Sequence, residues 1–177
     1  LGGNCTYLGQ TYSGTHSVTI ERADEGDVLV HHAWDELCNQ RVCVTGTADV
    51  TWSTAQGSRR VEHELEWTRL ADGRTGVGSG DRTQTALSGG ILEGIEVSGT
   101  RTWQGQSGQW DLAIDQVQFR WIDPVPQSGS YTLDTPFDKS MSLGFERQDF
   151  DTIRVTVASG SREFHFDVTA LGIEQSG

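Results

Sequence analysis

VCVTGTADVTWSTAQGSRRVEHELEWTRL, the segment from Val42 to Leu70, decides the fold of this chain. Apolar residues alternate with Thr, Asp and Ser in its first arm, and with charged residues in its second arm. A period of two residues is typical of a β-strand, in which successive side chains point to opposite faces. Residues 56–58, Gln-Gly-Ser, supply a polar turn between the arms. The segment therefore predicts a hairpin with one apolar and one polar face, as in an antiparallel sheet.

Similar alternation recurs along most of the chain. The other segments with a two-residue period are residues 16–21, 28–34, 91–103, 110–121, 141–145, 153–157 and 164–168. The period changes phase near Asp115 and Gln116, which predicts a β-bulge there. No segment shows a helical period over a useful length. We predict one all-β domain over residues 1–177, a large antiparallel meander of about ten strands curled into a sandwich or partly open barrel.

Composition and charge exclude several classes of protein. A chain of 177 residues can bury about 70% of its extended surface in one core, so a second domain is not needed. No apolar run reaches the length of a membrane-spanning helix, so we expect no transmembrane segment. The net charge of -12 disfavours DNA and RNA as partners, because nucleic-acid affinity rests on Lys and Arg. We expect the acidity to serve solubility.

Two of the three cysteines are spaced for a disulfide. Cys38 and Cys43 flank four residues that can form a tight turn. A bridge between them would contribute about 2 kcal/mol in the chain-entropy model. Disulfides indicate an oxidising compartment. The only methionine is Met141, so we expect that residue 1 is not an initiator and that a leader has been removed or the chain trimmed.

The third cysteine, Cys5, is left over in the sequence LGGNC. An odd cysteine in a secreted chain suggests lipid attachment, an intermolecular bridge, or pairing with one of the other two. The segment resembles the end of a bacterial lipoprotein leader, in which a lipid-bearing cysteine follows a leucine and small residues. A lipid anchor on Cys5 is what this resemblance implies.

Three histidines, His16, His32 and His63, fall on the apolar side of their predicted strands. Converging imidazoles would suit a zinc ion, and the alternative is that each histidine is hydrogen-bonded at the margin of the core. No spacing motif accompanies them, so we expect no metal. The acidic loops at 24–27, 134–138 and 149–151 offer oxygens for calcium but match no EF-hand, and we interpret them as solvated turns.

Large and charged side chains also share the apolar side. Glu93 and Arg101 have the same parity as Ile95 and Val97, which suggests a polar pair inside a cavity of the sheet. A closed or half-closed barrel around such a cavity could carry an amphiphile.

Most of the tryptophans are expected in the core. Those on the apolar side are Trp34, Trp52, Trp67, Trp103 and Trp121.

Two short motifs, V-T-G-T at residues 44–47 and V-S-G-T at 97–100, are each followed by a Thr-Trp pair. With the Thr-rich alternation and the Cys5 start, they resemble uncharacterised secreted or lipid-anchored β-rich proteins of Gram-negative bacteria. The resemblance implies an antiparallel sheet and a secreted, periplasmic or outer-surface location.

These features favour a noncatalytic module with a structural or partner-binding role, either with another envelope protein or by self-association. The alternative is a carrier of an amphiphilic or lipid-like ligand in a barrel cavity. An enzyme ranks third, since no G-x-S-x-G elbow is present. The glycine-rich stretch at residues 73–80 lacks the context of a phosphate-binding loop, and we expect no cofactor.

Overall fold

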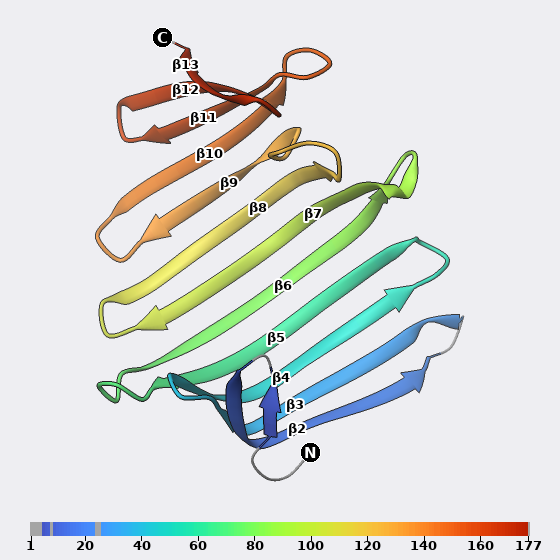
Figure 1. Ribbon diagram of the computed structural model, residues 1–177, viewed down its shortest axis with the longest axis vertical. Helices are drawn as coiled ribbons and strands as arrows, with labels where there is room; N and C mark the ends of the chain where they lie inside the picture. The colour runs from blue at the N-terminus through green and yellow to red at the C-terminus, as the bar shows by residue number, and fades with distance from the viewer. Residues whose placement is uncertain (1–4, 8, 24–25, 177) are drawn as a thin grey trace. The chain divides into compact units, whose positions relative to one another are not determined.

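The computed structural model describes residues 5–7, 9–23 and 26–176, which form thirteen strands and no helix (Figure 1). The strands are β1 (Cys5–Tyr7), β2 (Gln10–Arg22), β3 (Val28–Cys38), β4 (Val42–Ser53), β5 (Ser58–Arg69), β6 (Thr75–Leu87), β7 (Gly90–Gly105), β8 (Gly108–Arg120), β9 (Ser128–Thr135), β10 (Lys139–Arg147), β11 (Ile153–Ser159), β12 (Arg162–Thr169) and β13 (Gly172–Ser176). The all-β prediction is confirmed.

The strand order follows the chain order from β1 to β13, which is the predicted meander. The order is linear, and in the described ranges the first and last strands are not paired with each other. The meander is therefore not closed into a barrel. The strands outnumber the roughly ten predicted because Thr- and Gly-rich segments such as β6 form strands without an apolar alternation.

Contacts divide the chain into two compact units, which are described separately. Unit 1 comprises Leu1–Asp81 and Arg101–Gln109, and unit 2 comprises Arg82–Thr100 and Trp110–Gly177. A single domain over residues 1–177 stays a prediction from chain length.

In unit 1, the segment that decides the fold forms the predicted hairpin. Strands β4 and β5 pair along their whole length of 12 residues each. The turn between them occupies residues 54–57. Val50 and Val61 lie opposite each other and, with Ala48, are the buried apolar side chains of this hairpin. Alternation in the sequence therefore predicted the hairpin and its buried side, whereas the register follows from a turn at residues 54–57 instead of the predicted 56–58.

The glycines of the two V-[ST]-G-T motifs share an unusual backbone conformation. The φ angle is 138° at Gly46 in β4 and 141° at Gly99 in β7, in a region that residues with a side chain rarely adopt. A Cβ atom on Gly46 would lie 2.2 Å from the carbonyl oxygen of Glu64 on the paired strand. The repeated motif therefore marks a repeated backbone feature.

Unit 2 contains a cluster of aliphatic residues and the predicted bulge. The pairing of β8 with β9 shifts register between Asp115 and Gln118, and Gln116 has a φ of 47°. This extra residue lets Ile114 and Val117, three positions apart, enter the same cluster. The cluster consists of Val97, Ile114 and Val117, with Ile95, Leu112, Phe119 and Tyr131 packed against it.

The prediction that most tryptophans lie in the core is wrong. None of the six is buried, and Trp52 and Trp121 are 47% and 57% exposed. Alternation assigns a side chain to one face of a sheet, but it does not say what covers that face. No helix lies among the described residues, so a large ring on the apolar side is covered only by neighbouring strand residues.

Candidate functional site

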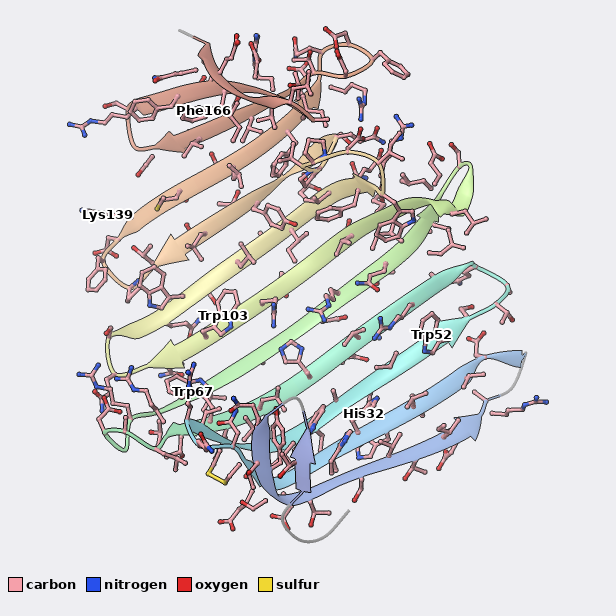
Figure 2. All side chains as sticks on the ribbon, viewed as in Figure 1. His32, Trp52, Trp67, Trp103, Lys139 and Phe166 are labelled. Carbon is pink, nitrogen blue, oxygen red and sulfur yellow. A yellow bond between two sulfur atoms is a disulfide. The ribbon has the colours of Figure 1, made fainter. Side chains whose placement is uncertain are left out.

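Antiparallel pairing places rings, imidazoles and aliphatic side chains from β2 to β5 on one face of unit 1, because directly opposite residues share a face. His16 lies opposite Trp34, and the next cross-strand row contains His32 and His63. We call this surface the aromatic face (Figure 2); it consists of His16, Val18, Ile20, Arg22, Val28, Val30, His32, Trp34, Ala48, Val50, Trp52, Arg59, Val61, His63, Leu65 and Trp67.

The acidic side chains of the paired rows lie on the opposite face of the same strands. They are Glu21, Asp35, Asp49, Glu62, Glu64 and Glu66. The aromatic face, in contrast, contains no carboxylate and carries Arg22, Arg59 and three histidines. In a chain of net charge -12, the sheet of unit 1 thus separates its acids from its rings.

Three rings on the aromatic face are stacked. His16 Nε2 lies 3.1 Å from His32 Nδ1, at hydrogen-bond distance. The centroid of the Trp34 ring is 5.1 Å from that of His16 and 5.7 Å from that of His32, with interplanar angles of 4° and 9°. The stack presents nearly parallel ring planes.

The third predicted histidine, His63, lies in the same cross-strand row as His32, with Ala48 between them. Two strands along a sheet span roughly 10 Å, which is too far for one metal ion bound by both imidazoles without a large shift. In the part of the chain that the structure describes, no three His, Cys, Asp or Glu residues are placed to hold a metal. The structure brings His16 and His32 together, and His63 lies two strands away from His32.

Two arginines in unit 1 contact tryptophan rings. The Arg59 guanidinium lies 4.9 Å from the centroid of the Trp52 ring, and that of Arg101 lies 5.3 Å from the Trp103 ring. These distances are within the range of cation–π interactions. The Trp67 ring lies against Gly76, where an added Cβ would be 2.5 Å from the ring. The β6 glycine therefore provides space for the indole.

Part of the aromatic face is open to solvent. Val18 is 47% exposed and Ile20 is 69% exposed, both on β2. Trp52 on β4 is exposed to a similar degree. Clusters of exposed apolar side chains on a sheet mark interaction surfaces.

The acidic face is occupied by ion pairs instead. Arg60 donates hydrogen bonds of 2.9 and 2.7 Å to Asp81, and it also lies 3.0 Å from Glu62. The hydrogen bonds from Arg60 lower the pKa of Asp81, while its partial burial acts in the opposite direction. His31 lies 2.6 Å from Asp49 on the same face. These contacts are those of a solvated surface.

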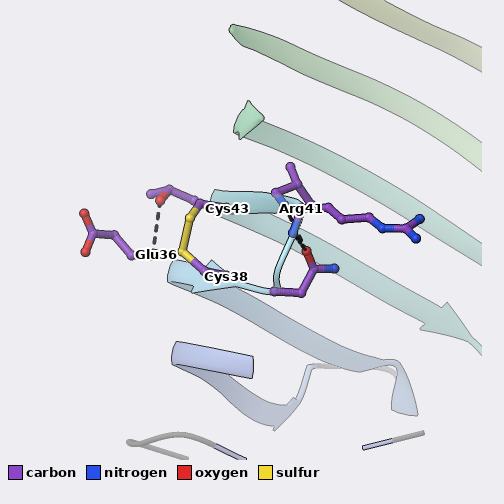
Figure 3. Close-up of a disulfide and its surroundings, with 7 residues drawn as sticks. Glu36, Cys38, Arg41 and Cys43 are labelled. Carbon is purple, nitrogen blue, oxygen red and sulfur yellow. Dashed lines mark hydrogen bonds between the residues drawn. A yellow bond between two sulfur atoms is a disulfide. The ribbon is translucent and has the colours of Figure 1, made fainter. Parts of the chain in front are cut away.

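The predicted disulfide is present: Cys38 and Cys43 are bonded and lie opposite each other in the β3–β4 pairing (Figure 3). The side chain of Asn39 accepts hydrogen bonds from the backbone N–H groups of Arg41 and Val42, which closes the turn. The disulfide therefore links β3 and β4 at their turn, at one end of the strands that carry the aromatic face. The backbone of Cys5 begins β1, and its side chain lies outside the described part of the structure.

Glu93 and Arg101 are not brought together. Both lie on β7, eight positions apart, which in an extended strand corresponds to about 26 Å. Glu93 accepts a hydrogen bond of 2.7 Å from the Gly89 N–H and lies 3.9 Å from Arg120. Arg101 contacts Trp103. Shared parity therefore does not by itself make two residues a pair, because neighbours on one side of a strand are two positions apart.

The acidic loops serve as turns where the structure describes them. The Asp149 carboxylate accepts hydrogen bonds from the backbone N–H groups of Asp151 and Thr152, and these bonds lower its pKa. Asp24 and Glu25 of the first acidic loop lie outside the described residues.

Comparisons with protein-family models, with characterised proteins and with solved structures give no significant match to this chain. No helix in the described residues is long and apolar enough to cross a membrane. The aromatic face of unit 1 is therefore the candidate functional site.

Proposed function

We propose that this chain is a noncatalytic binding module of the bacterial cell envelope that binds an anionic polysaccharide on the aromatic face of unit 1. The observation that carries the proposal is the separation of charge across the sheet. Six carboxylates lie on one face of the paired rows, and none lies on the other. An anionic partner would be repelled by the first face and attracted by the second.

The chemistry of the aromatic face suits a sugar chain with negative charges. The Trp52 ring, which is 47% exposed, offers a flat apolar surface on which a pyranose ring can stack. Arg22 and Arg59 lie in the same cross-strand row and can pair with carboxylate or sulfate groups. A nucleic acid fits less well, because its dense phosphates would meet the overall charge of -12.

The Cys38–Cys43 disulfide supports an oxidising compartment, and with it the envelope location in this proposal. Lipid attachment at Cys5 and a Gram-negative source are part of the same proposal. The alternative function, a carrier of an amphiphile, would need a lumen enclosed by strands. In the described residues the strand order is linear and the sheet is not closed around a lumen. We therefore place the ligand on an open face of the sheet.

The test is a titration of the protein with polygalacturonate at low salt, followed by tryptophan emission and calorimetry, with neutral dextran as the comparison. We expect binding of polygalacturonate that salt weakens, and at least about tenfold weaker binding for Trp52→Ala, which is about 1.4 kcal/mol. Arg59→Gln should also weaken binding. Arg162→Gln removes the same charge from the exposed start of β12 in unit 2 and should have no effect.

Equal binding of dextran, or unchanged binding by Trp52→Ala and Arg59→Gln, would refute the proposal. Tighter binding of single-stranded DNA than of polygalacturonate would replace the polysaccharide by a nucleic acid. Concentration-dependent dimerisation that Trp52→Ala abolishes, without any polysaccharide binding, would point to self-association through this face.

A further inference from the structure

Unit 2 contains a polar pocket that the sequence indicated only through Glu93, the residue it suggested for a cavity. Its volume is about 240 Å³, and it lies where the end of β6, the start of β7 and the end of β8 meet the segment that leads into β9. Two carboxylates and two amides line it, and no basic side chain does. The lining residues used below are Thr85, Leu87, Glu93, Glu96, Gln118 and Gln127.

A series of hydrogen bonds, each with a defined donor, fixes the orientation of the two glutamine amides in the pocket. Arg147 can only donate, and its Nε atom donates to Gln127 Oε1 at 3.2 Å. The Gln127 Nε2 atom must then be the donor to Gln118 Oε1, at 3.0 Å. In turn, Gln118 Nε2 donates to Glu96 Oε2 at 2.9 Å. The orientation of both amides therefore follows from Arg147, and the series of hydrogen bonds ends at the Glu96 carboxylate.

Arg147, which begins this series of hydrogen bonds, is held firmly outside the pocket. Arg147 pairs with Asp123, whose side chain is only 9% exposed, and donates to the carbonyl oxygen of Phe150 at 3.0 Å. The opposite wall is held by Glu93, which accepts from the N–H of Gly89. Both carboxylates of the pocket are therefore positioned before any ligand arrives, which lowers the entropic cost of binding.

The pocket is rich in acceptors and carries negative charge, of which the share of Glu93 is partly balanced by Arg120, 3.9 Å from its carboxylate. An ionised carboxylate offers about four acceptor sites, so the hydrogen bonds from the Gly89 N–H to Glu93 and from Gln118 to Glu96 leave lone pairs for a ligand. Thr85 adds a hydroxyl, and Leu87 supplies an apolar wall. A complementary ligand has several N–H donors, a positive charge and a short apolar stem.

We propose that this pocket binds the ammonium or guanidinium group of a small organic cation, such as an alkylamine or an arginine-like side chain. The volume lies just below the roughly 300 Å³ at which sites for larger ligands begin, so it suits one such group rather than a whole sugar or nucleotide. The described residues place no three metal-ligating side chains together, which favours an organic cation over a metal ion. The site belongs to unit 2 and does not rest on the function proposed for unit 1.

The test is a nitrogen–proton NMR titration of the full chain with methylguanidinium and with n-butylammonium. Urea and n-butanol serve as neutral probes of matched shape. We expect shift changes confined to residues 85–96 and 118–127 for the two cations, and none there for the neutral probes. Glu96→Gln should weaken cation binding at least about tenfold, because a charge-assisted hydrogen bond is lost.

A matched variant separates the pocket from the general attraction of an acidic protein for cations. Glu174→Gln removes the same charge from an exposed position on β13 and should leave binding unchanged. Glu93→Gln is the second pocket variant, in case Glu96→Gln disturbs the amide chain; resonances far from the pocket report on folding. Shift changes spread over the whole acidic surface, equal binding of the neutral probes, or full binding by both pocket variants would overturn the proposal.

Discussion

The apolar sides of the two units are built from different side chains. In unit 2, Val97, Ile114 and Val117 are buried and packed by further aliphatic and aromatic residues into a cluster. In unit 1, small buried residues such as Ala48 lie among stacked or half-exposed rings such as Trp52. Aliphatic clusters stabilise a fold by excluding water, whereas rings that keep one face exposed remain available for contacts. One alternating pattern therefore produces a closed aliphatic cluster in unit 2 and, in unit 1, a partly exposed aromatic face to which we assign the proposed binding.

The largest effect is expected at a large, fully buried side chain of unit 2. Ile153 is 1% exposed and lies opposite Val168. Ile153→Ala should lower the free energy of unfolding by about 3 kcal/mol, because it removes three carbons from a packed site and leaves a cavity. Ile173→Ala, at a position that is 69% exposed, should cost less than about 0.5 kcal/mol. Urea unfolding followed by circular dichroism measures both, and equal costs would contradict the contrast.

A smaller loss is expected from the covalent clamp of unit 1. Replacing both Cys38 and Cys43 by Ser should lower the free energy of unfolding by about 2 kcal/mol, through loop entropy alone. Dithiothreitol should destabilise the wild-type chain by a similar amount and leave the double variant unchanged. Alkylation of the unfolded, nonreduced chain followed by mass spectrometry should leave both cysteines unmodified. Labelling of either one would show that the clamp is absent.

The next largest loss of stability is expected at Gly76, which lies against the Trp67 ring. Gly76→Ala would place a methyl group 2.5 Å from the ring and 2.8 Å from the Gln104 carbonyl oxygen. We expect a cost of about 1.5 kcal/mol from overpacking and a changed tryptophan emission. Gly144→Ala in β10 meets no atom within 4 Å and should change neither quantity. If both variants behave alike, the ring of Trp67 is not held by β6.

Much of the fold could be predicted because strand pairing repeats a local rule. The two-residue period of residues 42–70 predicted the central hairpin, and the change of phase within residues 110–121 located the bulge. The spacing of Cys38 and Cys43 was enough for the disulfide, since two residues that flank a tight turn lie opposite each other. Strand β6 lies outside the alternating segments, because glycines replace the apolar side of its pattern.

The sites were predicted only in part, because a site depends on which strands are neighbours. Parity placed His16 and His32 on one side, but their contact follows from a diagonal across the β2–β3 register. Parity equally suggested Glu93 with Arg101, although they are far apart along one strand. The pocket was missed because Gln127 lies outside any alternating segment, and nothing in its local sequence indicates that it reaches Gln118.

The smallest effect concerns the acidic face of unit 1. Hydrogen bonds from Arg60 hold the pKa of Asp81 below its ordinary value of 3.8, although partial burial opposes them. Because the folded-state pKa is lowered, the pair contributes its full stability above the unfolded-state pKa of Asp81. That contribution is lost as the pH falls through the folded-state pKa. Arg60→Gln should therefore raise the pKa of Asp81, measured from its carboxyl carbon by NMR, and Arg162→Gln should not. Because the pair is exposed, we expect only a slight change in stability at neutral pH. A pKa that does not respond to Arg60→Gln would mean that the pair is absent in solution, and the ordered ionic face set against the aromatic face would lose its best-defined contact.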